Sequence, residues 1–220
     1  MTILTPSAPT NEVELLMRCE LIEGLTFSQL ASSIQCIIPS QPLKRKGWVG
    51  QAIEVALGAT AGNKSLPDFE QLGIELKTVP LNNNGFPAES TFVTTIPLLT
   101  INQQTWALSQ CYQKLKRVLW VPIEGDIRIP FEERRIGKVI LWSPNTTEES
   151  VLANDWLELS TMIGTGFLEE ITASYGEYLQ VRPKAANARS LCYGLNSEGN
   201  KILTLPRGFY LRSSFTKRFF

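Results

Sequence analysis

Two apolar segments of strand length place the strongest limit on the fold of this chain. Residues 117–123 (RVLWVPI) and 138–142 (KVILW) are mostly apolar, which is typical of strands buried at the centre of a sheet. The alternating residues 74–79 (IELKTV) predict a third strand. A turn at residues 81–87 (LNNNGFP) would join it to a strand at residues 91–98 as a hairpin.

Helical segments lie around these strands. Thr10 is placed to cap a helix over residues 11–22, and Thr26 with Gln29 predicts a capping box at the start of a shorter helix. The buried side of the first helix is expected to include Val13, Leu16 and Leu21. After a connector, a mostly apolar helix is predicted over residues 47–58.

The second half of the chain continues this mixture. Thr146 and Glu149 predict another capping box. Apolar residues then recur at helical spacing, namely Leu152, Trp156, Leu159 and Ile163. Three more strands are expected, at residues 178–181, 201–205 and 209–211. The sequence therefore predicts one mixed α/β domain over its 220 residues, with an N-terminal and a C-terminal lobe.

The composition excludes several kinds of chemistry. The chain has no histidine, which removes Ser-His-Asp and Cys-His nucleophiles and nearly all catalytic zinc sites. Its four cysteines are scattered and form no CxxC pair, as expected for reduced thiols in the cytoplasm. No apolar run reaches the roughly 18–20 residues of a membrane span, and residues 1–14 lack the pattern of a signal peptide.

Positive and negative charges are equal in number but separated along the chain. Lys and Arg together number 21, as do Asp and Glu. Residues 145–181 contain seven acids and no base, whereas residues 182–220 contain eight bases and a single acid, Glu198. A basic face of this kind suits a polyanion such as nucleic acid. A solvated basic surface without a partner would give the same pattern.

Asp68, Glu75 and Lys77 form the pattern D-x6-E-x-K. On a strand, side chains two residues apart point the same way at a spacing of about 6.6 Å, so Glu75 and Lys77 share a face while Ile74 and Leu76 pack on the other. Asp68 can fold back beside Glu75 from the preceding turn. Two such carboxylates favour a hard cation such as Mg²⁺, and a lysine beside it can orient an attacking water. The pattern therefore predicts phosphodiester hydrolysis, although an exposed strand with a salt bridge would look the same.

Two further residues could belong to such a site. Glu54 stands within a mostly apolar helix, where a buried carboxylate needs a partner such as a metal or a lysine. Lys114 precedes the apolar run 118–121, where a strand would deliver it to the same sheet edge. The alternatives are an exposed Glu54 and an ordinary surface lysine. Residues 58–65 (GATAGNKS) resemble a phosphate-binding loop, but their glycine spacing is wrong and they follow a helix, so ATP binding is not expected.

Longer blocks of sequence carry a more specific signal. They are KGWVGQAIEVALGATAGNKSLPDFEQLGIELKTVPL, KLKRVLWVPIEG, LWSPN, GEYLQVRPKAANAR and ILTLPRGFYLRSSF. In this order, over almost the whole chain, they closely resemble the MutH DNA mismatch-repair endonucleases of γ-proteobacteria. The resemblance implies a restriction-endonuclease-like fold, with a mixed central sheet flanked by helices. It also implies that the N-terminal catalytic lobe and the C-terminal DNA-reading lobe form a DNA cleft.

The resemblance also implies an activity. The family uses Mg²⁺ to nick the unmethylated strand of double-stranded DNA at hemimethylated GATC sites, on the 5′ side of the G. MutS and MutL are its activating partners. On this basis the catalytic residues are Asp68, Glu75, Lys77, Glu54 as the additional acid and Lys114 as the second lysine. The metal ligands are expected to be Asp68, Glu75 and Glu54.

The same resemblance assigns residues to DNA. The expected contacts are Lys46, Gly47, Phe92, Arg182, Pro183, Lys184, Arg207, Tyr210 and Arg212. Arg182 suits a guanine in the major groove, and Tyr210 is the expected sensor of the adenine N6 position. Phosphate contacts that fix the register are expected from Lys184, Arg207 and Arg212.

Two other functions compete with this one. A restriction endonuclease would cut both strands, but the chain has one D-x6-E-x-K set and no obvious dimer helix, which favours a monomer that nicks. A DNA-binding module without catalysis would have no use for two clustered carboxylates. The chain stops at residues 216–220 (TKRFF), whereas the resemblance leads us to expect a longer final helix.

Overall fold

The structure is a computed structural model that describes residues 6–62, 65–185, 187 and 189–220, with Lys46 described by its backbone alone. The chain divides into two compact units. The first unit comprises Met1–Ala88, Lys116–Ser143 and Phe219–Phe220, and the second comprises Glu89–Leu115 and Pro144–Arg218. Each unit is therefore assembled from separate stretches of the sequence. None of the helices in the described part of the chain has the length and apolar character that a membrane crossing requires.

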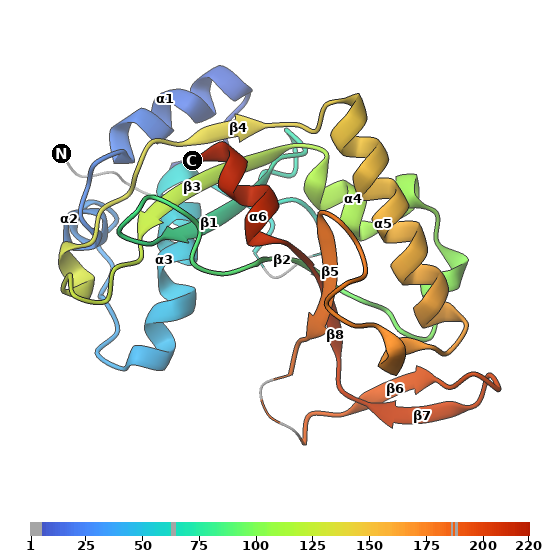
Figure 1. The fold of residues 1–220 in the computed structure, drawn as a ribbon. Helices are drawn as coiled ribbons and strands as arrows, with labels where there is room; N and C mark the ends of the chain where they lie inside the picture. The colour runs from blue at the N-terminus through green and yellow to red at the C-terminus, as the bar shows by residue number, and fades with distance from the viewer. Residues whose placement is uncertain (1–5, 63–64, 186, 188) are drawn as a thin grey trace. The chain divides into compact units, whose positions relative to one another are not determined.

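The first unit is a three-stranded sheet with helices (Figure 1). Its elements are α1 (Glu12–Ile22), α2 (Phe27–Ser33), α3 (Pro42–Leu57), β1 (Glu75–Leu81), β3 (Val118–Glu124), a 3-10 turn η3 (Phe131–Glu133) and β4 (Ile140–Trp142). The sheet order is β1-β3-β4, with β1 parallel and β4 antiparallel to β3. The central place of β3 confirms the prediction from its apolar sequence, whereas β4 is a short edge strand and not a central one.

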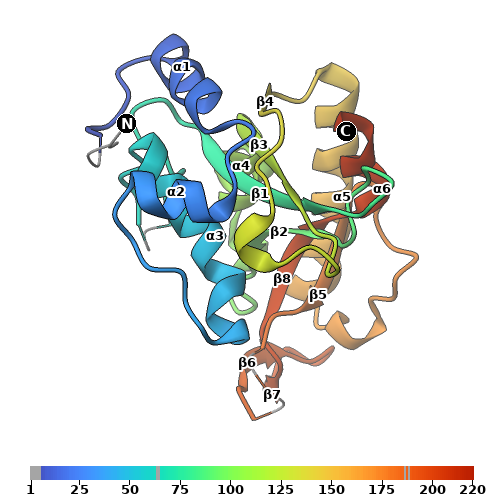
Figure 2. The same cartoon turned by 90° about the vertical axis from the view of Figure 1, so that its left-hand side faces the viewer.

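Helices α1, α2 and α3 gather on one side of this sheet (Figure 2). Ile53 and Leu57 of α3 are fully buried in one core cluster with Leu76 of β1 and with Leu119 and Val121 of β3. Side chains alternate along a strand, so the residues between these positions point to the other face of the sheet. Glu75 and Lys77 are among those residues.

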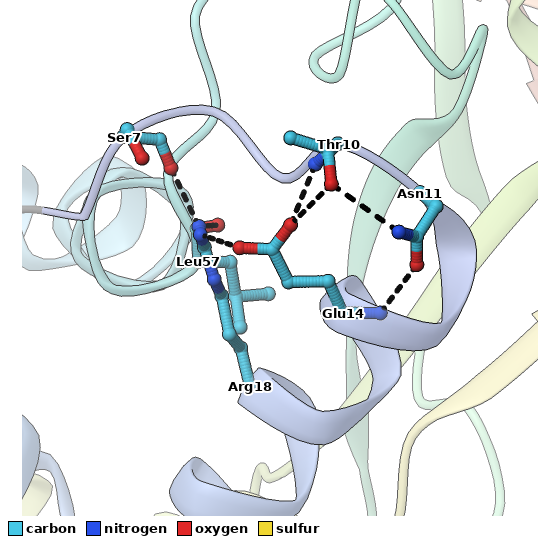
Figure 3. Close-up of polar contacts among 6 residues, drawn as sticks. All are labelled: Ser7, Thr10, Asn11, Glu14, Arg18 and Leu57. Carbon is cyan, nitrogen blue, oxygen red and sulfur yellow. Dashed lines mark hydrogen bonds and ion pairs between the residues drawn. The ribbon is translucent and has the colours of Figure 1, made fainter.

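The N-terminus of α1 differs from the prediction (Figure 3). Asn11 is the cap, because its side-chain oxygen accepts a hydrogen bond from the Glu14 backbone N–H at 2.9 Å. Thr10 instead donates to the Glu14 carboxylate from both its backbone and its hydroxyl group. The buried residues of α1 are Leu15, Cys19 and Ile22, so Val13 and Leu21, which are 68% and 61% exposed, were wrongly assigned to the core.

Helix α3 begins at Pro42, five residues earlier than predicted, because proline fits the first turn of a helix. The capping box of α2 is confirmed, with Thr26 and Gln29 exchanging both hydrogen bonds. Gly58 ends α3 in the left-handed region with φ 83°, which explains a glycine at this position. The segment that resembles a phosphate-binding loop follows this cap, and its residues 63–64 lie outside the described part of the chain.

The predicted hairpin between the strands at 74–79 and 91–98 does not form. Strand β1 pairs with β3, while β2 (Thr91–Thr95) belongs to the second unit and pairs with β8 (Arg207–Leu211). The turn at residues 82–87 closes only locally, because the Asn82 side chain accepts hydrogen bonds from the backbone of Asn84 and Phe86. The fully buried β3 is a better partner for β1 than an amphipathic strand would be.

The second unit contains two small antiparallel sheets (Figure 1). Its helices are α4 (Gln110–Leu115), α5 (Thr146–Gly164) and α6 (Ser213–Thr216), with 3-10 turns at Ile101–Gln103, Trp106–Leu108 and Leu168–Glu170. The strands are β2, β5 (Leu179–Pro183), β6 (Cys192–Leu195), β7 (Lys201–Thr204) and β8. One sheet has the order β2-β8-β5, and β6 with β7 forms a separate hairpin. The sequence did not predict β6.

Helix α5 holds the start of β5 in place. Its capping box uses Asn145 and Glu148, one residue before the predicted pair, and its predicted apolar residues are all buried as expected. Asp155, only 6% exposed, accepts hydrogen bonds from the backbone N–H groups of Glu177, Tyr178 and Leu179 at 2.8, 2.6 and 2.8 Å. A buried carboxylate that is satisfied in this way fixes the register of the strand that follows.

Candidate active site and DNA-reading surface

Strand β1 carries a buried acid beside a lysine. Glu75 is 2% exposed, and its Oε1 atom accepts a hydrogen bond from Nζ of Lys77 at 2.6 Å. Both side chains lie on the face opposite Ile74 and Leu76, as predicted. The neighbour of Lys77 on β3 is Trp120, which is fully buried. The ion pair is therefore shielded from water, so its electrostatic interactions are stronger than those at a surface.

Asp68 lies at the entrance to this strand. Its Oδ2 atom accepts a hydrogen bond from the Leu76 backbone N–H at 2.8 Å, and its carbonyl oxygen accepts from Thr60 and Ala61 at 3.0 and 3.3 Å. A bridge between Phe69 and Ile74 closes the loop between Asp68 and β1. These bonds hold Asp68 against the start of the strand, as expected of an aspartate that folds back from the preceding turn.

Glu54 faces β1 from helix α3. It is half-buried, and its Oε1 atom lies 4.0 Å from the position that a Cβ atom on Gly50 would occupy. The hydroxyl oxygen of Thr78 on β1 lies 3.9 Å from the same position. Among the described residues, no three His, Cys, Asp or Glu side chains are grouped so as to hold a metal ion. Asp68, Glu75 and Glu54, the three carboxylates predicted as ligands, therefore do not form such a group in this structure.

The donor chemistry of Asp68 and Glu75 nevertheless fits Mg²⁺. Asp68 and Glu75 supply hard carboxylate oxygens, and this ion usually uses one or two carboxylates together with water and substrate phosphate. Lys114 is not delivered by a strand, contrary to the prediction. It lies in the last turn of α4 in the second unit, and β3 begins only at Val118.

The second unit displays cations over aromatic rings on the sheet β2-β8-β5. The rings of Phe92 and Tyr210 oppose each other across β2 and β8, with their centroids 5.3 Å apart at an angle of 65°. Nζ of Lys184 lies 4.0 Å from the Phe92 centroid, and Cζ of Arg182 lies 5.9 Å from the Tyr210 centroid. We call these four residues the cation–aromatic cluster. Its two cations are exposed, so they can reach an external ligand.

Two features prepare this cluster for binding. Nη1 of Arg182 donates to the Ser90 hydroxyl at 2.6 Å, which restricts a side chain that would otherwise be mobile. Burial raises the pKa of Tyr210 above its ordinary value, so its hydroxyl group stays protonated at neutral pH. A protonated phenol can both donate and accept a hydrogen bond.

Arg207 and Arg212 have internal partners in place of the predicted phosphate contacts. Arg207 is 9% exposed, and its guanidinium donates to Glu169 Oε1 at 2.9 Å and to the Leu205 carbonyl at 3.0 Å. Arg212 donates to the backbone carbonyls of Gly176, Ala173 and Tyr175. Both side chains are thus bonded within the second unit, while their contacts to DNA remain a prediction.

The remaining predicted contacts are less informative. Pro183 ends β5 and is exposed, as is Gly47 in α3. The side chain of Lys46 lies outside the described part of the molecule. Sequence reasoning missed two residues that position others: Ser90, which accepts a hydrogen bond from Arg182, and Asp155, which holds the start of β5. It also gave no role to Gly208, which lies next to a predicted strand, where a glycine can mark close packing.

A cavity of about 790 Å³ in the first unit lies away from the acid–lysine set. Its lining includes Leu81 at the end of β1, Pro122 on β3, and the final residues Phe219 and Phe220. Neither Asp68, Glu75, Lys77 nor Glu54 lines it.

The mixed α/β fold, with small sheets flanked by helices, is that of the restriction-endonuclease-like class. Comparison with known proteins identifies the family. The profile described as "DNA mismatch repair enzyme MutH" matches residues 57–155. The chain is 51% identical to the DNA mismatch repair protein MutH of Histophilus somni (strain 2336), over 98% of this chain and 96% of that protein. It is 48% identical to the DNA mismatch repair protein MutH of Escherichia coli (strain K12), over 96% of this chain and 92% of that protein. The chain belongs to the MutH family.

Proposed function

We propose that this chain is a Mg²⁺-dependent endonuclease of methyl-directed mismatch repair. It nicks the unmethylated strand of double-stranded DNA at hemimethylated GATC sites. The observation that supports the proposal is that Asp68 accepts a hydrogen bond from the backbone of Leu76, between Glu75 and Lys77, which form an ion pair, in a chain of the MutH family. No other pattern of the sequence offers an equivalent route to phosphodiester hydrolysis without histidine.

Each residue of the set has a distinct task. Mg²⁺, when bound, would supply a Lewis acid for the scissile phosphate. Asp68 and Glu75 are the residues that would hold it, since both present carboxylate oxygens at the start of β1. Lys77 is the cation that orients the attacking water and balances charge developing on the phosphate. Glu54 organises the site from α3, and Lys114 is the second catalytic lysine implied by the family resemblance.

The cation–aromatic cluster reads the DNA. Arg182 binds guanine bidentately, Lys184 binds a phosphate, and Tyr210 accepts a hydrogen bond from the N6 amino group of an unmethylated adenine. Phe92 packs beside Tyr210, and Lys46, Gly47 and Pro183 add contacts that fix the register. Arg207 and Arg212 support this surface from within. The exposed cations and their fixed rings support these assignments.

The partners follow from the same family. MutS reports a mismatch, MutL activates this endonuclease, and the chain acts on DNA as a monomer in the cytoplasm. The single D-x6-E-x-K set in the sequence supports a protein that cuts one strand at a time.

A plasmid assay tests the function. Supercoiled DNA with GATC sites, unmethylated or hemimethylated, is incubated with the protein in Mg²⁺ or in EDTA, with Glu75→Gln as the matched control. The proposal requires open-circular product in Mg²⁺ alone, with no product from the variant. On the hemimethylated plasmid, linear product from a single site would indicate a restriction enzyme instead. Binding without cleavage in Mg²⁺ would indicate a module that only recognises DNA.

A further inference from the structure

Gly208 is the second residue of β8 and lies beneath the cation–aromatic cluster. It pairs with Arg182 of β5 on one side and with Thr95 of β2 on the other. Residues two apart on a strand share a face, so Gly208 and Tyr210 point the same way. Gly208 is nevertheless buried, because aromatic rings cover it.

The space over Gly208 is too small for any side chain. A Cβ atom built there would lie 2.8 Å from Cε2 of Phe92 and 3.2 Å from Cε2 of Tyr210. It would also lie 3.1 Å from the carbonyl oxygen of Thr94, which belongs to the backbone of the neighbouring strand. The Phe92 ring, as the nearest group, would have to move, while the Tyr210 ring and the Thr94 carbonyl would each have to give by a few tenths of an ångström.

The positions of these rings depend on one another. A β-bulge between Phe92 and Thr94 turns β2 locally, which lets the Phe92 ring lie over β8. The edge-to-face contact with Tyr210 then sets the direction of the Tyr210 ring. A glycine in the middle of a strand normally weakens that strand. Its presence here is explained by the close approach of Phe92.

We propose that Gly208 is a specificity-determining position, which sets the place of the Tyr210 hydroxyl by allowing the Phe92 ring to lie against β8. This inference rests on the proposed function, because it concerns how the same surface tells methylated from unmethylated adenine. Gly208 is a positioning residue and makes no contact with DNA itself. Because Gly208 has no side chain, there is room for the rings of Phe92 and Tyr210, which contact the DNA.

The test measures binding, so it does not depend on cleavage. Dissociation constants are measured in EDTA for hemimethylated and fully methylated GATC duplexes, and their ratio gives the methyl discrimination. Gly208→Ala should reduce this ratio about tenfold, the range of one good base contact, while affinity for the fully methylated duplex changes little. Gly50→Ala is the matched control, because its added methyl group meets nothing nearer than 3.9 Å. Its ratio should equal that of the wild type.

A double-mutant cycle separates positioning from general damage to the fold. In a Phe92→Leu background the ring that Gly208 accommodates is gone, so Gly208→Ala should then change the ratio little further. If Gly208→Ala alone is poorly folded, the double variant relieves the overlap and can still be measured. Additive losses in the cycle would show that Gly208 does not act through Phe92, and would overturn the inference.

Two outcomes distinguish this inference from the proposed function. A wild-type protein that discriminates, together with a folded Gly208→Ala variant that discriminates equally well, overturns the role of Gly208 alone. A wild-type protein that shows no methyl discrimination and no nicking overturns the proposed function, and this inference with it. A loss of thermal stability in Gly208→Ala with an unchanged ratio would also count against the inference.

Discussion

The two units of this chain use positive charge in opposite ways. In the first unit Lys77 is shielded and paired with the buried Glu75 at 2.6 Å. In the second unit Arg182 and Lys184 are exposed and lie over aromatic rings. A shielded pair keeps its geometry and gains electrostatic strength, which suits chemistry, whereas exposed cations on a rigid base suit recognition of a polyanion.

The same contrast exists inside the second unit. Arg207 and Arg212 come from the basic segment that first suggested a nucleic-acid partner, yet their guanidinium groups bond to Glu169 and to backbone carbonyls. Arg182 and Lys184 from the same segment are exposed. The number of basic residues therefore exceeds the number of cations that the described structure leaves exposed.

The largest expected effect tests whether Asp68, Glu75 and Lys77 of the first unit carry the chemistry. Asp68→Ala, Glu75→Gln and Lys77→Met should each reduce nicking in Mg²⁺ by about a hundredfold to ten-thousandfold, the usual range for groups that assist a reacting centre. Specific binding measured in EDTA should stay near the wild-type value, because the phosphate contacts lie elsewhere. If any of the three variants nicked at close to the wild-type rate, the catalytic assignment would be wrong.

A second effect concerns stability in the same unit. Lys77→Met removes the cation that donates to the buried carboxylate of Glu75 at 2.6 Å, which should cost about 3–5 kcal/mol in the free energy of unfolding. Combining it with Glu75→Gln removes the buried negative charge as well, and much of that loss should be recovered. Urea unfolding of the two single variants and the double variant measures this coupling. If the loss in the free energy of unfolding of the double variant equals the sum of the two single losses, the two side chains do not stabilise each other.

A smaller effect tests the second unit. Tyr210→Phe keeps the ring and removes the hydroxyl, so methyl discrimination should fall by about 1–3 kcal/mol, or roughly tenfold to a hundredfold. Burial raises the pKa of this phenol above its usual value of about 10. The protonated form therefore persists as the pH rises, and wild-type discrimination should be constant from about pH 7 to about pH 9. Wild-type discrimination in the variant would remove Tyr210 from the sensor role.

The sequence predicted local features of the fold better than the pairing of its strands. The burial of β3 and the apolar side of α5 followed from composition and spacing alone. The partner of β1 did not, because a nearby turn made a hairpin with β2 the simplest choice. The order of segments along the chain does not reveal that β3, which comes much later, is the more apolar partner for β1. The capping residues of α1 and α5 were each missed by one position, because a neighbouring polar side chain could serve equally well.

The candidate site shows the same limit. The strand period placed Glu75 and Lys77 on one face, and the structure brings them into contact. Nothing in the sequence distinguished the buried Arg207 from the exposed Lys184, since both are bases in loops or strand ends of one basic segment. Only the position of Glu169 opposite Arg207 decides between them. This distinction also gives the last of the expected effects.

Substituting Lys184 and substituting Arg207 should affect different properties of the protein. Lys184→Ala removes an exposed cation, so the dependence of binding on salt should flatten by a slope of about 1, with little change in stability. Arg207→Ala removes a buried guanidinium that bonds to Glu169 and to Leu205, so it should lower the free energy of unfolding by about 1.5–3 kcal/mol. Its salt slope should stay near the wild-type value. Binding measured over a range of salt concentrations, together with urea unfolding, separates the two. A reduced salt slope in Arg207→Ala with unchanged stability would return this residue to the DNA-contacting surface and show that its bond to Glu169 opens when DNA binds.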